Sequence, residues 1–402
     1  MPASPSTARA INDRLALRLL QQDGPLTATQ LKSQTGLSRP TVSDLVDRLQ
    51  GAGLIRVVGE SGSDRRGPNA RLYGIVADRA HLAALDVRMD SVAVAVTDLL
   101  GVTLAEATLP IAGDTGTRPA VERAAALLER TARTAGTAPL HSVGIGAPGL
   151  IDPVTGELRN TARLPAWHRD LVGELQQRLS ATVLVENETN LAAIAEHRVG
   201  AAQDRDTFVL LWLGNGVGAA VMLDGKLRRG ASGGAGEIGF LPMPGTSGVP
   251  SADNCEGGFH SLAGSAAVRE LASGHGIDAG RSSDDDTQEP AAVSVVRAAL
   301  RADGPGAAAF LGELADRLAL GAAAVVSVLD PGCLVLAGEV GRAGGDELAS
   351  LVEERLARMS PLRTEVRAGV LGGGAVLRGA LFAAQDAAQD ALFAPGVPST
   401  TA

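Results

Sequence analysis

The chain has 402 residues, of which 45% are hydrophobic and only 2% aromatic, and its formal net charge is −9. This length predicts two or three domains at ~150 residues each, with cores built mainly from Ala, Val and Leu. The sequence has no apolar run of membrane-spanning length, no signal-peptide pattern at its start and only two cysteines, Cys255 and Cys333, which argues against a membrane or disulfide-rich secreted protein and favours the cytoplasm.

The first predicted element is an amphipathic helix over residues 12–22. The leucines predicted to face the helices that follow are Leu15, Leu19 and Leu20. Thr27 and Gln30 then have the spacing of a capping box, which predicts the start of a second helix. Gly36 is predicted to end that helix, because glycine adopts the left-handed conformation of a helix end at little cost.

A third helix is predicted from Ser38, which can cap its N-terminus, and Pro40 fits its first turn. Its apolar face, at helical spacing, consists of Val42, Leu45, Val46 and Leu49. The opposite face is polar, with short side chains at its N-terminal end, as a recognition helix in a DNA major groove requires. Helical hairpins that do not bind DNA share the two-helix pattern, so that pattern alone leaves both interpretations open.

The segment after the third helix favours DNA binding. Residues 54–58 and 71–75 predict two paired strands, and the residues between them are too polar to pack and have a basic tip at Arg65 and Arg66. We interpret this segment as a wing that contacts phosphates or a minor groove. Helices, strands and basic tip together predict a winged helix-turn-helix over residues 1–80, called the head below.

The charge distribution places any nucleic-acid contact in the head. Residues 1–80 contain 11 Lys and Arg against 7 Asp and Glu, whereas the remainder contains 25 against 38. The predicted partner is double-stranded operator DNA. The side chains predicted near base edges are Arg39, Thr41 and Ser43. Those predicted to contact the DNA backbone are Thr29, Gln30, Ser38 and Arg48, together with Arg65 and Arg66 from the wing.

The body after residue 80 contains one pattern twice. Strands predicted at residues 82–86, 92–98 and 102–109 form a meander, and a second meander begins at residue 207. Helices and strands alternate after each meander. This repetition predicts two α/β halves, residues 81–200 and 201–402, which close around a cleft suited to a small ligand.

Several motifs of the body resemble those of the ROK family, which comprises repressors, open reading frames and sugar kinases. The motifs are residues 144–152 (GIGAPGLID), Trp167, residues 185–190 (VENETN) and residues 219–239, which end in GEIG. The resemblance implies an actin-like, ATPase-type fold of two duplicated ribonuclease H-like halves, a sugar in the cleft, and dimers or tetramers on palindromic operators. With the head in front, the chain resembles the xylose- and N-acetylglucosamine-responsive repressors of the family.

On the nucleotide side, the sequence departs from the kinase pattern. Family kinases have Asp-Gly-Gly-Thr in their first phosphate loop, where this chain keeps Asp86 but has Arg88, which adds bulk, and Asp90, which adds charge of the wrong sign. Glu339 is a similar addition in the loop implied to lie near adenosine. We therefore expect that a triphosphate does not fit, and we interpret the glycines kept at residues 214–218 as hairpin geometry.

On the sugar side, the resemblance assigns ligand contacts to Asn187 and Glu237, which are kept, and to two altered positions, Glu188 and His260. Glu188 replaces the catalytic Asp with a longer arm, a displacement of ~1 Å that weakens a general base without abolishing it. His260 replaces a sugar-binding Glu, although a histidine in a surface loop is an equally open interpretation. Phe240 replaces a His that contacts both sugar and zinc in the family.

The zinc knuckle of the family is also altered. Its cysteine positions carry Ser251, Asp253 and Gly258, and Cys255 and His260 alone do not complete a tetrahedral set of thiolate and imidazole ligands. We therefore predict no metal and no other cofactor.

Three functions remain open from the sequence. The first is a DNA-binding repressor, without enzymatic activity, whose body senses a sugar or sugar derivative and sets the geometry of a homodimer or homotetramer. The second is a regulator that has lost ligand binding and keeps the body as an oligomerisation scaffold. The third is a bifunctional ATP-dependent sugar kinase, which the altered phosphate loop disfavours.

Overall fold

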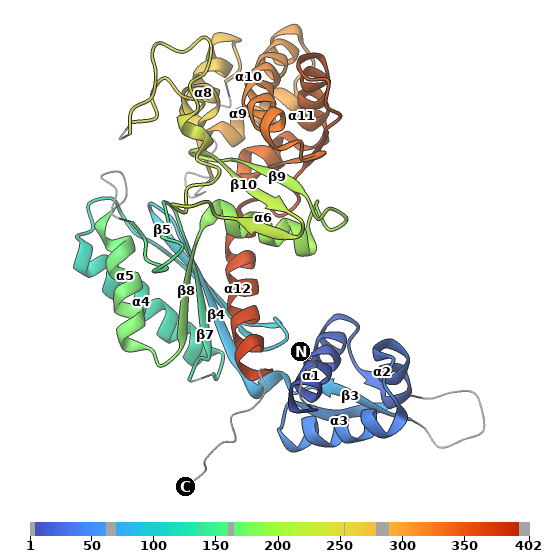
Figure 1. The fold of residues 1–402 in the computed structure, drawn as a ribbon. Helices are drawn as coiled ribbons and strands as arrows, with labels where there is room; N and C mark the ends of the chain where they lie inside the picture. The colour runs from blue at the N-terminus through green and yellow to red at the C-terminus, as the bar shows by residue number, and fades with distance from the viewer. Residues whose placement is uncertain are drawn as a thin grey trace.

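The computed structural model describes residues 5–61, 70–137, 139–159, 165–252, 254–278 and 289–393. Figure 1 shows a small helical head beside an elongated body that contains two sheets, each flanked by helices. Within these described residues, no helix is both long and apolar enough to cross a membrane.

The head is a winged helix-turn-helix with a small antiparallel sheet in the order β1-β3-β2. Its elements are α1 (Pro5–Gln22), β1 (Leu26–Thr27), α2 (Ala28–Thr35), α3 (Arg39–Gly51), β2 (Ile55–Ser61) and β3 (Ala70–Ile75). The predicted capping box of Thr27 and Gln30 is present, Gly36 is left-handed with φ +70, and Ser38 caps α3. The predicted apolar face of α3 is buried. The local rules of helix capping and periodicity therefore located this domain correctly.

The first helix differs from its prediction in length and orientation. α1 begins at Pro5, before the predicted start, and it buries Ala16, Leu17 and Leu20. The prediction that Leu15 faces the helix-turn-helix is wrong, because this side chain is 39% exposed. Leucines occur on more than one side of α1, so periodicity alone could not select the buried side, and packing on the head core decides it.

The first half of the body contains a five-stranded sheet in the order β6-β5-β4-β7-β8. After the short helix η1 (Ala77–Arg79), its elements are β4 (His81–Val87), β5 (Ser91–Asp98), β6 (Thr103–Pro110), α4 (Thr117–Thr134), β7 (Ser142–Ala147), α5 (Ala166–Arg178), β8 (Thr182–Asn187) and α6 (Glu188–Val199). β7 is parallel to both β4 and β8. Helices α4 and α5 cover one face of the sheet, and α6 lies on the other (Figure 1).

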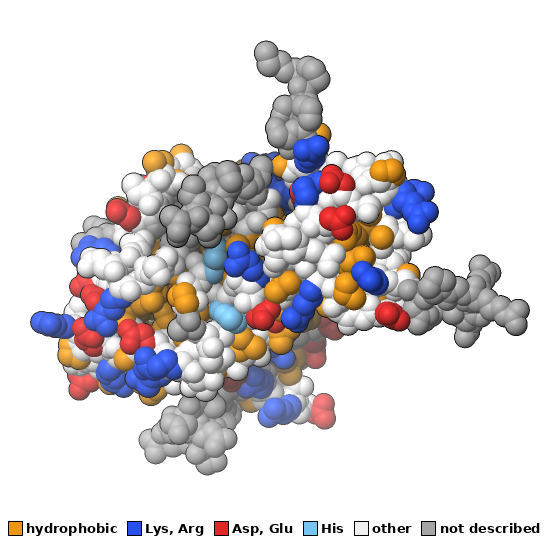
Figure 2. Space-filling view, turned by 90° about the horizontal axis from the view of Figure 1, so that it is seen from below, with side chains coloured by type: hydrophobic (Ala, Val, Ile, Leu, Met, Phe, Trp, Pro, Cys, Tyr) orange, Lys and Arg blue, Asp and Glu red, His pale blue; other side chains and the backbone are white. Residues whose placement is uncertain are grey.

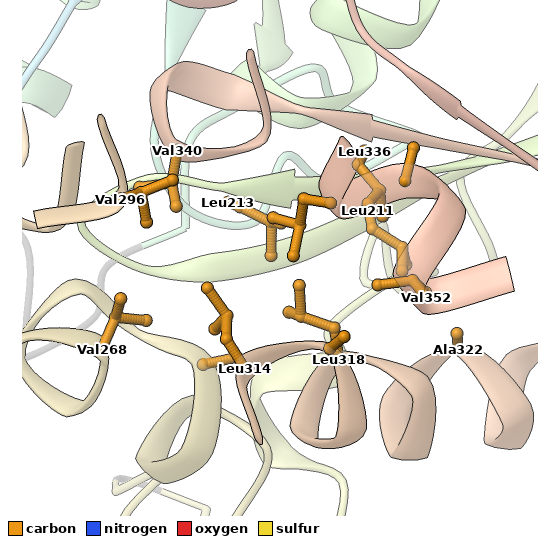
Figure 3. Packing of buried hydrophobic residues seen from close by; sticks show 14 of the residues in the cluster. Leu211, Leu213, Val268, Val296, Leu314, Leu318, Ala322, Leu336, Val340 and Val352 are labelled. Carbon is orange, nitrogen blue, oxygen red and sulfur yellow. The ribbon is translucent and has the colours of Figure 1, made fainter. Parts of the chain in front are cut away.

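The second half repeats this topology with the order β11-β10-β9-β12-β13. Its elements are β9 (Phe208–Leu213), β10 (Val217–Leu223), β11 (Lys226–Arg228), η2 (Ile238–Phe240), α7 (His260–Ala263), α8 (Ser265–Gly274), α9 (Ala291–Arg301), α10 (Pro305–Leu329), β12 (Cys333–Ala337), α11 (Gly338–Met359), β13 (Glu365–Ala368), η3 (Gly372–Gly374) and α12 (Ala375–Leu392). Leu211 and Leu213 of β9 face Leu314 and Leu318 of α10 across an aliphatic core (Figure 3). The duplicated meanders predicted from the sequence are therefore present.

Two helices of the second half differ from their predictions at glycines. The helix predicted over residues 261–272 is split into α7 and α8, because the backbone is extended at Gly264, with ψ 157. The helix predicted to begin at residue 346 is the later part of α11. α11 begins at Gly338 and kinks at Gly345, whose φ of +56 suits glycine.

The last helix, α12, links the body to the head. A Cβ atom at Gly144 of β7 would collide with the Ala380 carbonyl group, and one at Gly379 would collide with the carbonyl group of Leu191 in α6. The end of α12 contributes Ala388, and the segment after it Phe393, to the hydrophobic cluster that forms the head core. The domain boundaries near residues 80 and 200 stay predictions, and α12 connects the parts on either side of both.

Candidate DNA interface and ligand cleft

The recognition helix α3 is fixed by its buried aliphatic face, which leaves its predicted base-contacting side outward. Arg39 and Ser43 are exposed, and Thr41 is half-buried. The Oγ atom of Ser38 accepts a hydrogen bond from the Thr41 backbone N–H (3.3 Å) and lies 2.8 Å from Thr41 Oγ1. The two hydroxyls therefore shape the start of α3, and their predicted DNA contacts stay predictions.

Two predicted backbone contacts are already engaged within the head. The side-chain oxygen of Gln30 accepts from the Thr27 backbone N–H at 2.9 Å as part of the capping box. Arg48 forms ion pairs with Asp13, at 2.6 Å, and with Asp44. A phosphate contact by Arg48 would therefore compete with two carboxylates, whereas Thr29, at the start of α2, is exposed.

The tip of the wing, with Arg65 and Arg66, lies outside the described residues. On the lower face of the molecule, Lys and Arg side chains are interspersed with Asp and Glu side chains over the coloured surface (Figure 2). Such a mixed surface favours recognition by a few well-placed side chains rather than by a broad field of positive charge.

The cleft residues of the first half lie at the carboxyl ends of parallel strands. Asp86 near the end of β4 pairs in register with Gly146 of β7, and the next residue of β7 pairs with Asn187 at the end of β8. Glu188 follows as the first residue of α6. This edge of an α/β sheet is where ligands usually bind, because loops and helix starts converge there.

Asn187 has a structural role at this edge. Its Oδ1 atom accepts hydrogen bonds from the backbone N–H groups of Thr189 (2.9 Å) and Asn190 (3.2 Å), which caps α6. Its Nδ2 atom donates to the Gly149 carbonyl oxygen at 2.9 Å, which holds the Gly-Ala-Pro-Gly loop against α6. A ligand contact by Asn187 therefore stays a prediction, and the ligand would share this amide.

Glu188 lies in surroundings that disfavour its charge. Burial, followed by the negative charges of Asp86 and Glu339, raises the pKa of Glu188 to about 8. The carboxyl group is consequently mostly protonated at neutral pH and can donate as well as accept a hydrogen bond. A protonated carboxyl group is a poor general base at pH 7.

Arg88 crosses the cleft and joins the two halves. Its Nε atom lies 2.9 Å from Asp86 Oδ2, its Nη1 atom lies 3.2 Å from Glu339 Oε1, and its Nη2 atom donates to the Gly373 carbonyl oxygen at 2.7 Å. We call these four residues the Arg88 bridge. The sequence indicated only the bulk of Arg88 and the added charge of Glu339. Their opposite signs on facing loops were the available sign of a pair.

The backbone of the bridge is held from the first half by His168. This buried side chain has its Nε2 atom 3.1 Å from the Arg88 carbonyl oxygen, and burial lowers its pKa to about 4. The imidazole is therefore neutral at pH 7 and donates from Nε2. It fixes the turn that carries Arg88 without adding charge.

The two remaining predicted ligand contacts come from the second half. Glu237 is exposed, and its charge is among those that raise the pKa of Glu188, which places both carboxyl groups around one cleft. His260 begins α7, and its ring lies 3.9 Å from the point that a Cβ atom on Gly216 would occupy. His260 thus lines the hairpin after β9. Neither geometry tests whether the residues bind a ligand.

The altered knuckle region was also predicted to lack metal. Among the residues that the structure describes, no three His, Cys, Asp or Glu side chains are grouped closely enough to hold a metal ion. Asp253, at one of the knuckle positions, lies outside the described residues.

Comparisons with known proteins agree with this geometry. The ROK family model matches residues 82–387, and the MarR family model matches residues 11–67. The xylose repressor of Caldicellulosiruptor bescii is 25% identical over 380 residues, which cover 90% of this chain and 94% of that protein.

Two solved structures have the same body. A ROK family transcriptional regulator, described as a homologue of the Escherichia coli MLC protein, superposes with a TM-score of 0.76 at 22% identity, covering 96% of this chain and 98% of that one. A ROK glucokinase from Streptomyces griseus, solved with glucose and AMPPNP, has a TM-score of 0.64 at 25% identity, covering 76% of this chain and all of that one. The body is thus shared by regulators and kinases, whereas the kinase match covers less of this chain.

Proposed function

We propose, from the premise that this chain belongs to the ROK family and is a transcriptional regulator with a winged helix-turn-helix head, that it represses transcription and responds to a sugar or sugar derivative in its cleft. The ligand would change the geometry of the body, and α12 would pass that change to the head. Two heads in a homodimer or homotetramer would then lose their spacing on a palindromic operator.

One observation carries this proposal: α12 extends from the Arg88 bridge to the head core. Gly373, directly before α12, accepts the hydrogen bond from Arg88. Farther along the helix, Gln385 donates to the Leu99 carbonyl oxygen at 3.0 Å, and Asp390 forms an ion pair with Arg14 of α1. A shift of the bridge would therefore move a helix that is packed on the DNA-binding head.

We further propose that the body has no kinase activity. Phosphoryl transfer depends on positioning and on neutralising phosphate charge, and the Arg88 bridge occupies the loop that would approach the phosphates. Glu188, at the position of the catalytic Asp, is mostly protonated at neutral pH. A coupled ADP-release assay over a panel of sugars tests this point, and measurable turnover would reverse it.

A ligand-independent regulator is the second candidate, because the Asn187 amide is engaged in capping α6 and holding a loop. Thermal unfolding with each sugar separates the candidates. A ligand at ~100 times its dissociation constant adds ~2.7 kcal/mol to the stability of the folded state, whereas a pure scaffold shows no shift with any sugar.

The deciding experiment is a footprint of the purified chain on the DNA upstream of its own gene, with and without each sugar. We expect protection of a palindrome at low salt and its loss with one sugar. The Arg39→Ala variant is the matched control for the head, because Arg39 is exposed and its loss should weaken protection without unfolding the chain. Protection that no sugar alters would support the scaffold function instead.

A further inference from the structure

We propose that the effector is an unphosphorylated sugar, either uncharged or amine-bearing, and that the cleft discriminates against sugar phosphates. This inference rests on the proposed function, because it specifies the ligand of the same cleft. Charge and hydrogen-bonding capacity at the strand edge carry it.

The described cleft is lined by more carboxylates than cations. Asp86, Glu188 and Glu339 surround Arg88, whose guanidinium group is already paired with two of them. The second arginine at this edge, Arg229, lies 2.5 Å from Glu186 and is likewise paired. An incoming phosphate would meet like charges and would have to break an existing ion pair to gain a counter-charge.

Asp86 provides an independent sign of the missing partner. Its Oδ2 atom is bound to Arg88, but its Oδ1 atom is buried and has no hydrogen-bond partner, and the residue is only 2% exposed. A buried acceptor without a donor is costly, so a ligand that supplies a hydroxyl or ammonium hydrogen there would be favoured. The oxygens of an ionised phosphate are acceptors and cannot supply it.

Glu188 complements this acceptor. Because its carboxyl group is mostly protonated at neutral pH, it can donate to one hydroxyl oxygen of a sugar and accept from another hydroxyl group. A divalent cation is the other ligand that carboxylates attract, but no group of three metal-binding side chains is close enough to hold one within the described residues. The spacing therefore fits an organic ligand whose hydroxyl groups are spread over several ångströms.

Outside this edge, Arg342 on the exposed side of α11 packs against Gly372. It is separated from the acceptor at Asp86 by the Arg88 bridge, which begins at Gly373 on that side. A phosphate drawn to Arg342 would thus bind apart from a sugar at Asp86 and Glu188.

Calorimetry on the full chain at pH 7 tests the inference with matched pairs. The probes are glucose and glucose 6-phosphate, N-acetylglucosamine and its 6-phosphate, and glucosamine. We expect at least one free sugar to bind and its phosphate, where it exists, to bind about tenfold more weakly or worse, because each like charge in the cleft opposes it. A phosphate that binds as tightly as its free sugar would overturn the inference and leave sugar sensing intact.

Variants separate charge from shape. Glu339→Gln removes one negative charge and should narrow the gap between free and phosphorylated sugar by at least threefold, with far-ultraviolet dichroism confirming the fold. Glu188→Gln, whose side chain is already mostly neutral at pH 7, should leave the gap unchanged there. A gap unaffected by Glu339→Gln would show that shape, not charge, excludes the phosphate. Absence of binding by every probe would overturn both this inference and the proposed sugar sensor.

Discussion

A single carboxyl group sets the pH response of the cleft. The pKa of Glu188 is raised from its ordinary value of 4.5 to about 8, chiefly by burial. Folding therefore favours the protonated form. Its contribution to stability is complete below about pH 4.5 and is lost as the pH rises through about 8. The neutral amide of glutamine would keep the hydrogen-bonding shape without this cost.

We expect Glu188→Gln to be more stable than the wild type at pH 9 by roughly 1–3 kcal/mol, with the difference disappearing near pH 4.5. Urea unfolding at pH 4.5, 7 and 9 measures it. Glu106→Gln, an exposed carboxyl group on β6, is the matched control and should show no such trend. A difference that stayed constant with pH would mean that the Glu188 carboxyl group ionises normally in the folded chain.

The Arg88 bridge makes a second prediction about single residues. Arg88→Ala leaves the buried Asp86 carboxylate without its partner and should lower the free energy of unfolding by about 2–4 kcal/mol. Combining it with Glu339→Ala should cost less than the sum of the two single changes, by about 1 kcal/mol or more. Arg159→Ala, which breaks an exposed pair with Asp152, should cost less than ~1 kcal/mol. Additive effects at Arg88 and Glu339 would contradict coupling across the cleft.

At the scale of elements, local sequence signals predicted the secondary structure well. β7, β10 and α6 have the bounds that were expected, because a buried apolar run or a capping residue marks each end. The two meanders were predictable since the hairpin of Asp224 and Gly225, both at positive φ, has a strong sequence signature. The splits at Gly264 and Gly345 were not, because a glycine within a helical pattern does not say which conformation tertiary packing selects.

The position of α12 also could not be predicted from its own sequence. Its pattern predicts an amphipathic helix, but its place on the first sheet depends on Gly144 and Gly379, which let two backbones approach closely. The candidate site is similar in this respect. Motif resemblance selected Glu188 and Glu237, whereas the contact between Arg88 and Glu339 joins residues 251 positions apart and appears only in three dimensions.

The close approach of α12 predicts a sharp difference between two glycines. Gly379→Ala would drive a Cβ atom into the Leu191 carbonyl group, so it should cost more than ~2 kcal/mol and weaken the response of DNA binding to the effector. Gly374→Ala, just before α12, meets no atom within 4 Å and should change stability by less than ~0.5 kcal/mol. Thermal unfolding and DNA release by the same sugar measure both effects. Equal behaviour of the two variants would contradict a tightly packed α12.

At the scale of the whole molecule, a mildly basic head is joined to an acidic body. Residues 1–80 carry 11 Lys and Arg against 7 Asp and Glu, and the rest carries 25 against 38. Phosphate contacts should therefore come from the head alone, and the body should be repelled from DNA. The salt dependence of binding counts these contacts, because each neutralised phosphate releases condensed counterions.

Two head variants should consequently fail in different ways. Arg66→Ala, at the predicted wing tip, should weaken binding to all duplexes and reduce the slope of log affinity against log salt by about one per head. Thr41→Val keeps the shape of the side chain but removes a hydroxyl group at the start of α3, so it should alter base preference while leaving the slope unchanged. Fluorescence anisotropy on operator variants at several salt concentrations separates the two. A uniform loss for Thr41→Val would restrict its hydroxyl group to the helix-capping contact with Ser38, which the structure already contains. An unchanged slope for Arg66→Ala would rule out the wing contact.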